Sequence, residues 1–386
     1  MNVLVTGARG FVGRNLVQAL RLRPDVELLE HDLGVPEQQF ADALDRAALI
    51  FHLAGVNRPP SAEEYEAGNA GFTQEICHRL QAAGRTPKIV FASSTQAALD
   101  NPYGRSKRHA EEWLRQFSDA TGAQVTIFRW TNLFGKWCRP NYNSVTATFC
   151  HNTARGLPIH VSDPGAEIEL AYIDDVVVRL TAELVGQVAN LPEQRQVGNL
   201  PHGQRVTIAG VQPTYRTTVG ALAALVQSFR NSRTDLRLPE LADRFTRCLY
   251  ATYLSYLPDD QFAYPLDVKS DVRGELAEFL KSPHSGQIFV SRTKPGVTRG
   301  NHFHHTKVEK FLVLEGEAVI RFRHVESQEV LSYSVSGRDF RVVDIPPGYT
   351  HAIENVGPQE MVVLFWASEI FDPSVPDTYA ARVLDE

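Results

Sequence analysis

The chain has 386 residues, of which 43% are hydrophobic and 22% charged, and its formal net charge is −6. This length exceeds what one hydrophobic core usually supports, so we expect two domains. An acidic balance without a basic block argues against nucleic acid as a partner. No apolar run reaches the roughly 18 residues that span a bilayer, and the opening MNVLVTG has no signal-peptide pattern. Four scattered cysteines form no CxxC pair, so we expect a cytoplasmic protein.

The first half of the chain alternates short apolar strands with amphipathic helices. Strands are expected at residues 2–5, 27–29, 48–53, 88–92 and 125–128, and helices at 11–22, 37–47 and 63–83. Apolar strands that alternate with helices are typical of a parallel sheet with both faces covered. The sequence therefore predicts an α/β domain with a doubly wound, Rossmann-type sheet.

A glycine-rich turn, TGARGFVG at residues 6–13, follows the first strand. Its glycines allow a tight turn and let a pyrophosphate approach the backbone at the start of the next helix. A turn without a ligand is the alternative, but the strand–turn–helix setting favours a dinucleotide. The residues expected at the cofactor are Gly7, Arg9, Gly10, Phe11, Val12, Gly13, Leu53, Ala54 and Lys107.

Two residues bear on the choice between NADPH and NADH. Arg9 lies inside the glycine loop, where it can pair with a 2′-phosphate. Asp32 follows the second strand, where it can instead accept a hydrogen bond from a free 2′-hydroxyl. We expect NADPH and leave NADH open, because the sequence does not fix the position of Asp32.

Tyr103 and Lys107 stand four residues apart in YGRSK, so both side chains lie on one face of a helix. A lysine ammonium stabilises a phenolate, so we expect the pKa of Tyr103 to fall toward a value useful for proton transfer. A hydroxyl in the preceding segment, SST at residues 93–95, can polarise a substrate carbonyl. A surface pair is the ordinary explanation of such spacing, but its place after the glycine loop favours catalysis.

These motifs resemble the extended short-chain dehydrogenases/reductases that act on nucleotide sugars. Further matching segments are FHLAG at 51–55, RWTNLFG at 129–135 and YIDDV at 172–176, and the resemblance covers about residues 1–240. It implies a catalytic set of Ser94, Tyr103 and Lys107, with Ser93 or Thr95 as weaker candidates for the serine. It also implies that Asn132 faces the nucleotide diphosphate of the substrate.

The second half of the chain has a different secondary-structure pattern from the first. Short β-rich runs at 287–290, 311–314, 318–322 and 361–365 are separated by Gly and Pro turns. This pattern is typical of an antiparallel barrel or sandwich. The aromatic-rich stretch before it indicates a packed connector rather than a flexible linker. We therefore expect a reductase domain at 1–245, a connector at 246–270 and an all-β barrel at 271–386.

Four residues of the barrel form a candidate metal site. His302 and His304 alternate in HFHHTKVE, so on a strand they point to the same side. Glu309 ends that segment, and His351 ends the later segment PPGYTH. Three imidazoles and a carboxylate suit Zn, Fe, Mn or Ni, and we expect a divalent ion, with Zn first. A structural role without metal is the alternative.

The two histidine segments resemble the two cupin motifs. One departure is that Phe340 stands where a glycine is expected six residues before Pro346, with Gly337 nearby. This departure affects the local turn and leaves the four candidate ligands in place.

A second resemblance, to cupin-type epimerases of 4-keto deoxysugar nucleotides, rests on DVRGELAEF at 271–279 and RGNH at 299–302. It implies substrate contacts by Arg273, Glu278 and Arg299. It also implies that the histidine of RGNH is a base, so His302 stays open as base or ligand. His305 and Lys307 are further candidates for proton transfer, although such residues are ordinarily exposed loop positions.

In order and over nearly its full length, the chain resembles bifunctional capsular polysaccharide enzymes of the CapF type. That resemblance implies C3 epimerisation of a UDP-2-acetamido-2,6-dideoxy-4-keto-hexose in the barrel. It also implies C4 reduction with NADPH to an L-talose-type product, on the route to UDP-N-acetyl-L-fucosamine, and a homodimer. One alternative is a reductase or dehydratase with a barrel that only mediates dimerisation. The other is a non-catalytic dinucleotide-binding scaffold, which the intact Tyr103 and Lys107 disfavour.

Overall fold

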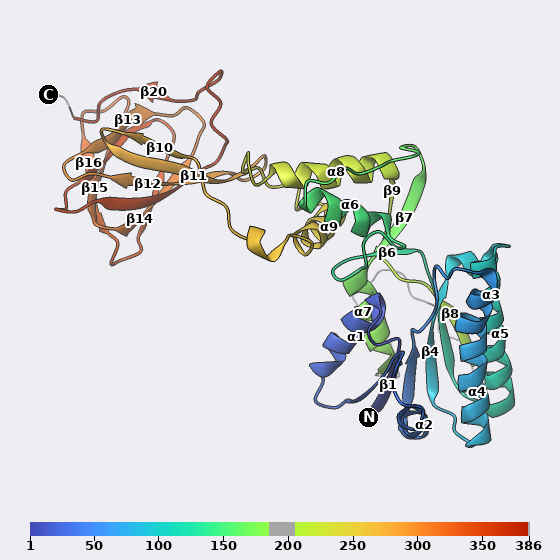
Figure 1. Cartoon of the computed structure of the whole chain (residues 1–386). Helices are drawn as coiled ribbons and strands as arrows, with labels where there is room; N and C mark the ends of the chain where they lie inside the picture. The colour runs from blue at the N-terminus through green and yellow to red at the C-terminus, as the bar shows by residue number, and fades with distance from the viewer. Residues whose placement is uncertain (185–204, 385–386) are drawn as a thin grey trace. The chain divides into compact units, whose positions relative to one another are not determined.

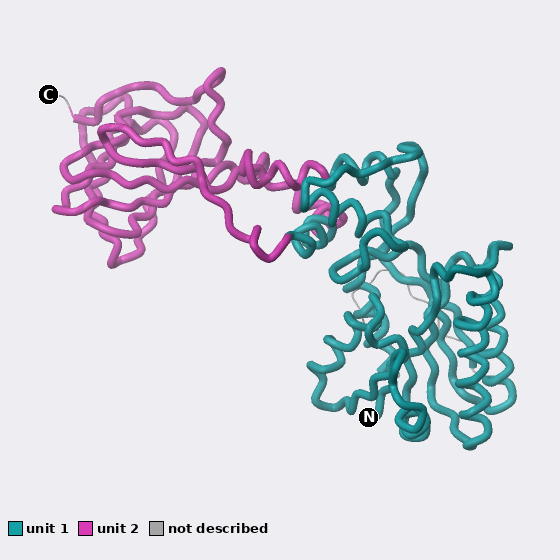
Figure 2. The backbone as a smooth tube through the Cα atoms, in the orientation of Figure 1, with its two compact units in different colours: residues 1–226, 248–257 teal, residues 227–247, 258–386 magenta. Residues whose placement is uncertain are grey.

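The computed structural model describes residues 1–184 and 205–384 and divides into two compact units (Figures 1 and 2). One unit comprises residues 1–226 with 248–257, and the other comprises 227–247 with 258–386. The finer limits expected for the reductase domain, the connector and the barrel stay a prediction.

A six-stranded sheet forms the centre of the N-terminal unit, in the order β2-β1-β3-β4-β5-β8, and all its pairings are parallel. The strands are β1 (Asn2–Thr6), β2 (Glu27–His31), β3 (Leu49–His52), β4 (Lys88–Ser94), β5 (Val125–Trp130) and β8 (Val206–Ala209). The order reverses between β1 and β3. In parallel sheets a ligand crevice lies at such a switch point, outside the carboxyl ends of the strands.

Helices cover both faces of this sheet, as the alternation in the sequence predicts (Figure 1). On one face Leu16 of α1 (Phe11–Arg21) and Val176 of α7 (Ile173–Thr181) share a core with the strands. On the other face the core includes Phe40, Ile76 and Leu114. These come from α2 (Glu37–Arg46), α4 (Phe72–Ala82) and α5 (Pro102–Thr121), in that order.

The helix expected over 63–83 is not one regular α-helix. It consists of α3 (Ala62–Tyr65), a π-helical turn (Glu66–Gly71) and α4. The wider turn contains Asn69, which is buried and exchanges hydrogen bonds with the backbone N–H and C=O of Val56 (2.9 and 3.1 Å). A polar side chain that must bond inward, together with two glycines, explains why the helix departs from the regular pattern here.

The remaining elements of the middle of the chain form a small sheet and three helices. The sheet has the order β6-β7-β9. The elements are β6 (Asn132–Phe134), β7 (Glu167–Tyr172), β9 (Thr214–Thr218), α6 (Val145–Ala154), α8 (Val219–Asn231) and α9 (Arg244–Leu254). Within the described residues, every helix is too short or too polar to cross a membrane.

The C-terminal unit contains two antiparallel sheets that pack into a cupin-like sandwich. Their orders are β10-β11-β12-β19-β14-β17 and β16-β15-β18-β13-β20. The strands are β10 (Val268–Asp271), β11 (Gly274–Ser282), β12 (Gly286–Thr293), β13 (Thr298–Phe303), β14 (Glu309–Glu315), β15 (Glu317–His324), β16 (Val330–Ser336), β17 (Val342–Ile345), β18 (Tyr349–Asn355), β19 (Met361–Ala367) and β20 (Tyr379–Ala380). Phe311, Ile320, Val363 and Phe365 lie in the core between the sheets. The predicted fold class, a Rossmann-type sheet followed by an all-β cupin unit, is confirmed.

Phe340 has a positive φ of 42°, in a region of backbone space that favours glycine. The position at which the second cupin motif usually has glycine is therefore occupied here by a residue in the left-handed region. Phe340 tolerates it at the surface, where its side chain is 69% exposed.

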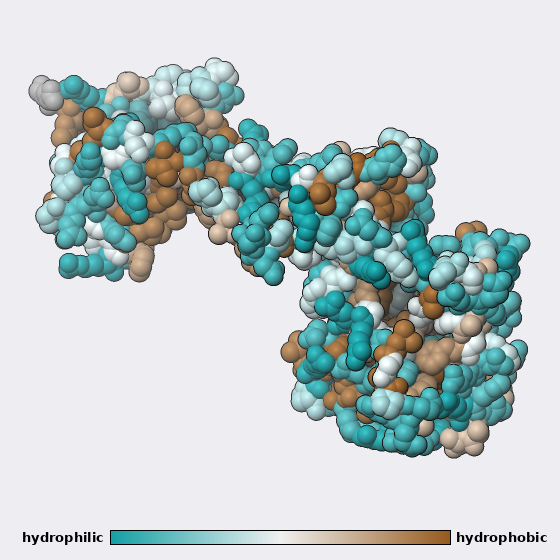
Figure 3. Space-filling model, viewed as in Figure 1, coloured by the Kyte–Doolittle hydropathy of each residue, from teal (hydrophilic) through white to brown (hydrophobic). Residues whose placement is uncertain are grey.

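The larger sheet of the C-terminal unit is apolar on its outer face as well. Ile288, Val290, Leu312, Leu364 and Trp366 alternate with core residues and are half-buried. Hydrophobic residues gather on the face of this unit that Figure 3 displays. Antiparallel sheets commonly carry polar residues on a face exposed to water, so an apolar outer face is an unusual feature of this sheet.

Candidate functional site

The glycine loop after β1 packs closely on the end of β3. Gly7 has φ 69°, and a Cβ atom there would lie 2.7 Å from the backbone nitrogen of Ala54. A Cβ on Gly13 would lie 2.0 Å from the carbonyl oxygen of Gly7, so α1 approaches the loop as only glycine permits. The backbone of Leu53 bonds to Thr6 (3.2 Å). The candidate cofactor residues from two distant segments therefore meet at the switch point, in a cradle that fits a dinucleotide pyrophosphate.

Both candidates for cofactor choice lie at this loop. Asp32 directly follows β2, and its carboxylate accepts from the backbone N–H groups of Arg9 (2.6 Å) and Leu33 (2.8 Å). The side chain of Arg9 is exposed. The structure thus fixes Asp32 beside the loop, which sequence alone did not, and brings a carboxylate and a guanidinium to the same edge.

Ser94, Tyr103 and Lys107 come from the end of β4 and from the first two turns of α5. Asn101 caps α5 by accepting from the backbone N–H of Gly104 (2.8 Å). A Cβ on Gly104 would lie 2.2 Å from the carbonyl oxygen of Gln96, so glycine lets the start of α5 pack against the turn that follows β4. This packing brings Tyr103 near Ser94, whose hydroxyl acts on the phenol.

The three hydroxyls at the end of β4 have different partners. The hydroxyl of Ser94 acts on Tyr103, Ser93 donates to Glu111 (2.6 Å), and Thr95 lies 3.4 Å from the backbone carbonyl of Trp130. This geometry favours Ser94 for the serine role.

The pKa of Tyr103 moves opposite to our expectation. Burial raises it to about 12, and the hydrogen bond with Ser94 only partly offsets that effect. Lys107 lies 5.9 Å from the centre of the Tyr103 ring, and its Nζ donates instead to the carbonyl oxygen of Ala92 (3.0 Å). The expected lowering is therefore wrong, because burial dominates the pKa of Tyr103 and the ammonium of Lys107 bonds to a backbone carbonyl.

Lys107 is itself strongly affected by its surroundings. It is 4% exposed, and its Nζ lies 5.1 Å from the centre of the Phe91 ring. Burial lowers its pKa to about 8, and the carboxylate of Glu111 acts in the opposite direction. A lysine that titrates near neutral pH beside a buried tyrosine is typical of a functional site.

Glu111 is a polar residue of this site that the sequence analysis missed. It is 2% exposed and accepts two bonds from Arg129 of β5 (2.9 and 2.6 Å) and one from Ser93. It follows Lys107 by four residues, so Tyr103, Lys107 and Glu111 share one face of α5. That spacing was the available signal, but a glutamate on a helix is ordinarily exposed.

Asn132 lies outside this polar cluster. It is exposed on β6, where its side chain donates to the carbonyl oxygen of Glu169 (3.3 Å). Glu169, Thr95 and Arg129 line a cavity of about 150 Å³ at the ends of β4 and β5. Asn132 contacts the backbone of Glu169, one of the residues that line this cavity, and its predicted contact with the substrate stays a prediction.

The four candidate metal ligands of the barrel converge. His302 lies on β13, His304 directly follows it, Glu309 begins β14, and His351 lies on β18. One ligand atom from each lies within 4.8 Å of the others. In the register of the sheet, His302 is the direct partner of His351. The structure thus brings together residues that are up to 49 positions apart.

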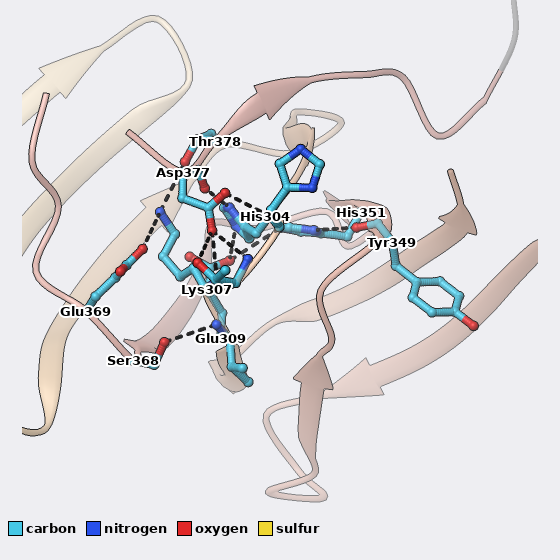
Figure 4. Close-up of polar contacts among 12 residues, drawn as sticks. His304, Lys307, Glu309, Tyr349, His351, Ser368, Glu369, Asp377 and Thr378 are labelled. Atoms are coloured by element: carbon cyan, nitrogen blue, oxygen red, sulfur yellow. Dashed lines mark hydrogen bonds and ion pairs between the residues drawn. The ribbon is translucent and has the colours of Figure 1, made fainter. Parts of the chain in front are cut away.

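Two imidazoles of the cluster, those of His304 and His351, point one ring nitrogen toward Glu309 (Figure 4). The Nδ1 atom of His304 bonds to the carbonyl oxygen of Asp377, and that of His351 lies 3.4 Å from the carbonyl oxygen of Tyr349. The Nε2 atoms of both rings are buried, lack a well-formed hydrogen bond, and lie 3.3 Å from Oε2 of Glu309. Buried polar atoms are rarely left unpaired, so this donor set fits a divalent cation.

Two members of the cluster have shifted pKa values that suit metal binding. Burial lowers the pKa of His302 to about 4, with a further contribution from His351. Burial acts to raise the pKa of Glu309, but the adjacent His304 and His351 outweigh it and bring the pKa to about 2. Neutral imidazoles and an ionised carboxylate are the forms that bind metal ions.

The other candidate residues of the barrel have partners of their own. Arg273 pairs with Asp271 (2.5 Å), Glu278 pairs with Lys281 (3.0 Å), and Arg299 donates to Thr293 (2.9 Å). Arg299 and Glu278 lie on the interior side of the sandwich, since their partners across the sheets, Ile353 and Phe289, pack in its core.

The two loop residues considered for proton transfer differ from each other. His305 is exposed and contacts the rings of Phe303 and Tyr379. Lys307 is buried and donates to Thr378 (3.1 Å). The expectation of an exposed loop residue is therefore correct for His305 and wrong for Lys307.

A parallel dinucleotide-type sheet with a serine–tyrosine–lysine set, followed in the same chain by a sandwich with a histidine–carboxylate cluster, defines a class of protein: a short-chain dehydrogenase/reductase fused to a cupin. Residues 3–193 match the NAD dependent epimerase/dehydratase family, and residues 269–379 match the polysaccharide biosynthesis C-terminal domain.

Full-length relatives have the same organisation. UDP-2-acetamido-2,6-beta-L-arabino-hexul-4-ose reductase of Pseudomonas aeruginosa is 43% identical over 99% of both chains. The crystal structure of the capsular polysaccharide assembling protein CapF of Staphylococcus aureus is 45% identical, with a TM-score of 0.89 over 99% of this chain and 100% of that one. The chain therefore belongs to the CapF-type family of capsular polysaccharide proteins, as its motifs predicted.

A more distant structure shares only the fold of one part. UDP-glucuronic acid 4-epimerase of Bacillus cereus, solved with NAD, is 14% identical, with a TM-score of 0.53 over 66% of this chain and 98% of that one. The likeness supports the nucleotide-binding fold of the N-terminal unit and nothing finer.

Proposed function

We propose that the N-terminal unit reduces the C4 ketone of a UDP-2-acetamido-2,6-dideoxy-hexulose with NADPH. One observation supports this most directly. Ser94, Tyr103 and the buried Lys107 meet beside the glycine loop, in a chain whose full length is similar to a reductase named for such a substrate. NADH stays open as the cofactor because Asp32 and Arg9 lie at the same edge of the loop.

The protein residues would act on the C4 oxygen. Bound NADPH supplies a hydride to C4, and the oxygen must then gain a proton. Tyr103 donates that proton from its phenol, while the hydroxyl of Ser94 donates a hydrogen bond to the same oxygen. A high pKa suits this direction of reaction, because Tyr103 stays protonated until negative charge develops on the substrate. The ammonium of Lys107 then stabilises the resulting phenolate.

A second activity, epimerisation at C3, is our proposal for the barrel. The observation that favours it is the cluster of His302, His304, Glu309 and His351. The 4-keto group acidifies the proton on C3, so a base can remove it and a proton can return on the opposite face. A divalent ion, with Zn as the first candidate, would supply positive charge near the C4 oxygen.

His302 differs from the other members of the cluster. It is half-buried, whereas His304, Glu309 and His351 are buried. It is therefore the member best placed to reach a substrate, and its role as base or as ligand stays open. Arg299, on the interior side of β13, is the cationic candidate for holding the sugar nucleotide, with Arg273 and Glu278 as further candidates from resemblance.

Fusing the two activities has a thermodynamic reason. Epimerisation has little driving force of its own, whereas hydride reduction of C4 removes the epimerised ketone. The product would be a UDP-2-acetamido-2,6-dideoxy-L-talose-type sugar, which precedes UDP-N-acetyl-L-fucosamine in capsule or O-antigen synthesis. The main alternative is a single reductase or dehydratase activity with a barrel that serves only for dimerisation.

An NMR experiment separates these alternatives. The full-length protein is incubated in heavy water with NADPH and a UDP-2-acetamido-2,6-dideoxy-4-hexulose that has not been epimerised at C3. Deuterium at C3 together with a reduced C4 is the expected result. Reduction without C3 label would remove the epimerase proposal and retain the reductase, and absence of both would overturn the proposed function.

We also propose a homodimer, in which the apolar outer face of β12, β14 and β19 meets a second copy. Light scattering after size exclusion should give about twice the 43.1 kDa chain mass. A Leu364→Lys variant, which places a charge at the centre of that face, should elute as a monomer.

A further inference from the structure

The chain that follows β19 returns across the candidate metal cluster. Its last part, residues 372–380, is here called the C-terminal segment. β20 within it pairs with β13, so that Ala380 lies opposite His302 and Tyr379 opposite Phe303. This pairing holds the C-terminal segment against the turn at 305–307, which connects His304 to Glu309.

The carboxylate of Asp377 binds that turn at several points (Figure 4). It accepts from the backbone N–H groups of His305, Thr306 and Lys307, each at 2.8 Å. It also accepts from the hydroxyl of Thr306 at 2.9 Å. These four hydrogen bonds hold the turn in place. The N–H groups of the turn need such an acceptor from another segment, because so short a turn cannot satisfy them itself.

The backbone of Asp377 contacts a candidate ligand directly. Its carbonyl oxygen bonds to Nδ1 of His304, a side chain that is 1% exposed. This bond places the imidazole proton on Nδ1 and leaves the lone pair of Nε2 directed toward Glu309, 3.3 Å away. A carbonyl partner on the second ring nitrogen both selects the tautomer and fixes the ring plane.

We propose that Asp377 is a positioning residue for metal binding: its carboxylate fixes the turn between His304 and Glu309, and its carbonyl orients His304. This inference rests on the proposed metal site and goes beyond it, because Asp377 is no ligand and lies 68 positions after Glu309. It assigns a functional role to a segment outside both cupin motifs.

Metal affinity of the full-length protein tests this role. Wild type, Asp377→Asn and Asp372→Asn are stripped with a chelator and titrated with Zn²⁺ against a chromogenic competitor. Asp372 is the matched control, because it is exposed in the same segment and bonds only within it, to Ser374. We expect Asp377→Asn to bind zinc about 10- to 100-fold more weakly and Asp372→Asn to stay within about twofold of wild type.

Two further readouts separate positioning from general stability. Co²⁺ bound to Asp377→Asn should show an altered visible spectrum, which a change in folding stability alone would leave unmoved. If Asp377→Asn fails to fold, Thr306→Val decides the matter, because it removes one of the four bonds and should weaken zinc binding about threefold or more.

The outcomes distinguish the two proposals. Wild-type protein that binds no zinc overturns both the metal site and the role of Asp377. Wild-type protein that binds zinc, with Asp377→Asn and Thr306→Val unchanged in affinity, overturns the role of Asp377 alone.

Discussion

The two candidate sites differ in how completely the protein satisfies their polar groups. In the N-terminal unit Ser94 lies near Tyr103, and Lys107 donates to the Ala92 carbonyl. In the barrel, the Nε2 atoms of His304 and His351 are buried without a well-formed hydrogen bond. The first site therefore holds its geometry through protein contacts, whereas the second leaves two buried ring nitrogens available to a cation.

This difference predicts how each site fails. A site held by its own hydrogen bonds should lose catalytic activity but keep its structure when one reacting group is removed. A site completed by an ion should lose function when the ion is withdrawn, with every side chain still present.

Tyr103→Phe should give the largest loss. The variant lacks the proton donor to the C4 oxygen, so kcat/KM for NADPH-dependent reduction should fall about 10²- to 10⁴-fold. NADPH oxidation on the keto sugar measures this loss. Deuterium exchange at C3 should continue, because the barrel does not use Tyr103.

Tyr65→Phe is the matched control for that variant. The Tyr65 ring lies 5.8 Å from the Tyr103 ring, but its hydroxyl donates to the Asn57 carbonyl. It should keep wild-type reduction within about threefold. Unchanged NADPH oxidation by Tyr103→Phe would contradict the role of the phenol.

Removal of the metal should act on the other half of the reaction. A bound cation stabilises developing negative charge by several kcal/mol, so its loss should slow C3 exchange about 10²-fold or more. Either a chelator or His351→Ala serves as the test, with exchange followed by NMR. Reduction of a sugar already epimerised at C3 should stay within about twofold.

His284→Ala controls for the loss of an imidazole, since His284 is an exposed residue paired with Glu240. It should retain C3 exchange. If a metal-free protein exchanged C3 as fast as the loaded one, the barrel would not need an ion for this chemistry.

Sequence reasoning succeeded where the pattern is local. Tyr103 and Lys107 share a helix face because they are four residues apart, and the glycine loop is recognisable from its strand–turn–helix setting. The metal cluster could be proposed because His302 and His304 alternate on a strand. The fold class followed from the periodicity of apolar residues in each half.

The rest depends on tertiary structure. The carboxylate of Glu111 is buried because Arg129 and Ser93, which lie on neighbouring strands, bond to it. The spacing of residues in the sequence does not indicate these contacts. Asp377 reaches the metal cluster only because β20 pairs with β13. The raised pKa of Tyr103 also depends on packing. The sequence indicates that a lysine lies nearby, but it does not indicate in which direction the Nζ atom of that lysine points.

Glu111→Gln should change the pH dependence of reduction. The groups that face Lys107 are Glu111 and Tyr103 on α5 and His52 on β3. Burial holds the pKa of Lys107 near 8, below its ordinary 10.5, so the ammonium loses its proton as pH rises through about 8. We therefore expect kcat/KM of the wild type to decline above that pH.

Glu111 raises the pKa of Lys107, so its neutralisation should move the decline to lower pH by about one unit. A pH–rate profile measures the shift. Glu112→Gln is the control, because Glu112 is adjacent on α5 but exposed. A profile that is identical for Glu111→Gln and wild type would remove Lys107 as the group that limits activity at high pH.

The smallest effect concerns the cofactor. The carboxylate of Asp32 is fixed beside the glycine loop by the Arg9 amide, where it opposes a 2′-phosphate and favours a 2′-hydroxyl. Asp32→Asn should therefore raise the ratio of kcat/KM with NADPH to that with NADH by about three- to tenfold. Arg9→Ala should lower the same ratio, because it removes the cation available to the phosphate. Asp25→Asn, in the exposed turn before β2, should leave the ratio unchanged.

If neither Asp32→Asn nor Arg9→Ala moved the ratio by more than about twofold, the ribose 2′ position would lie away from both side chains. The glycine loop would then hold the pyrophosphate without selecting the cofactor.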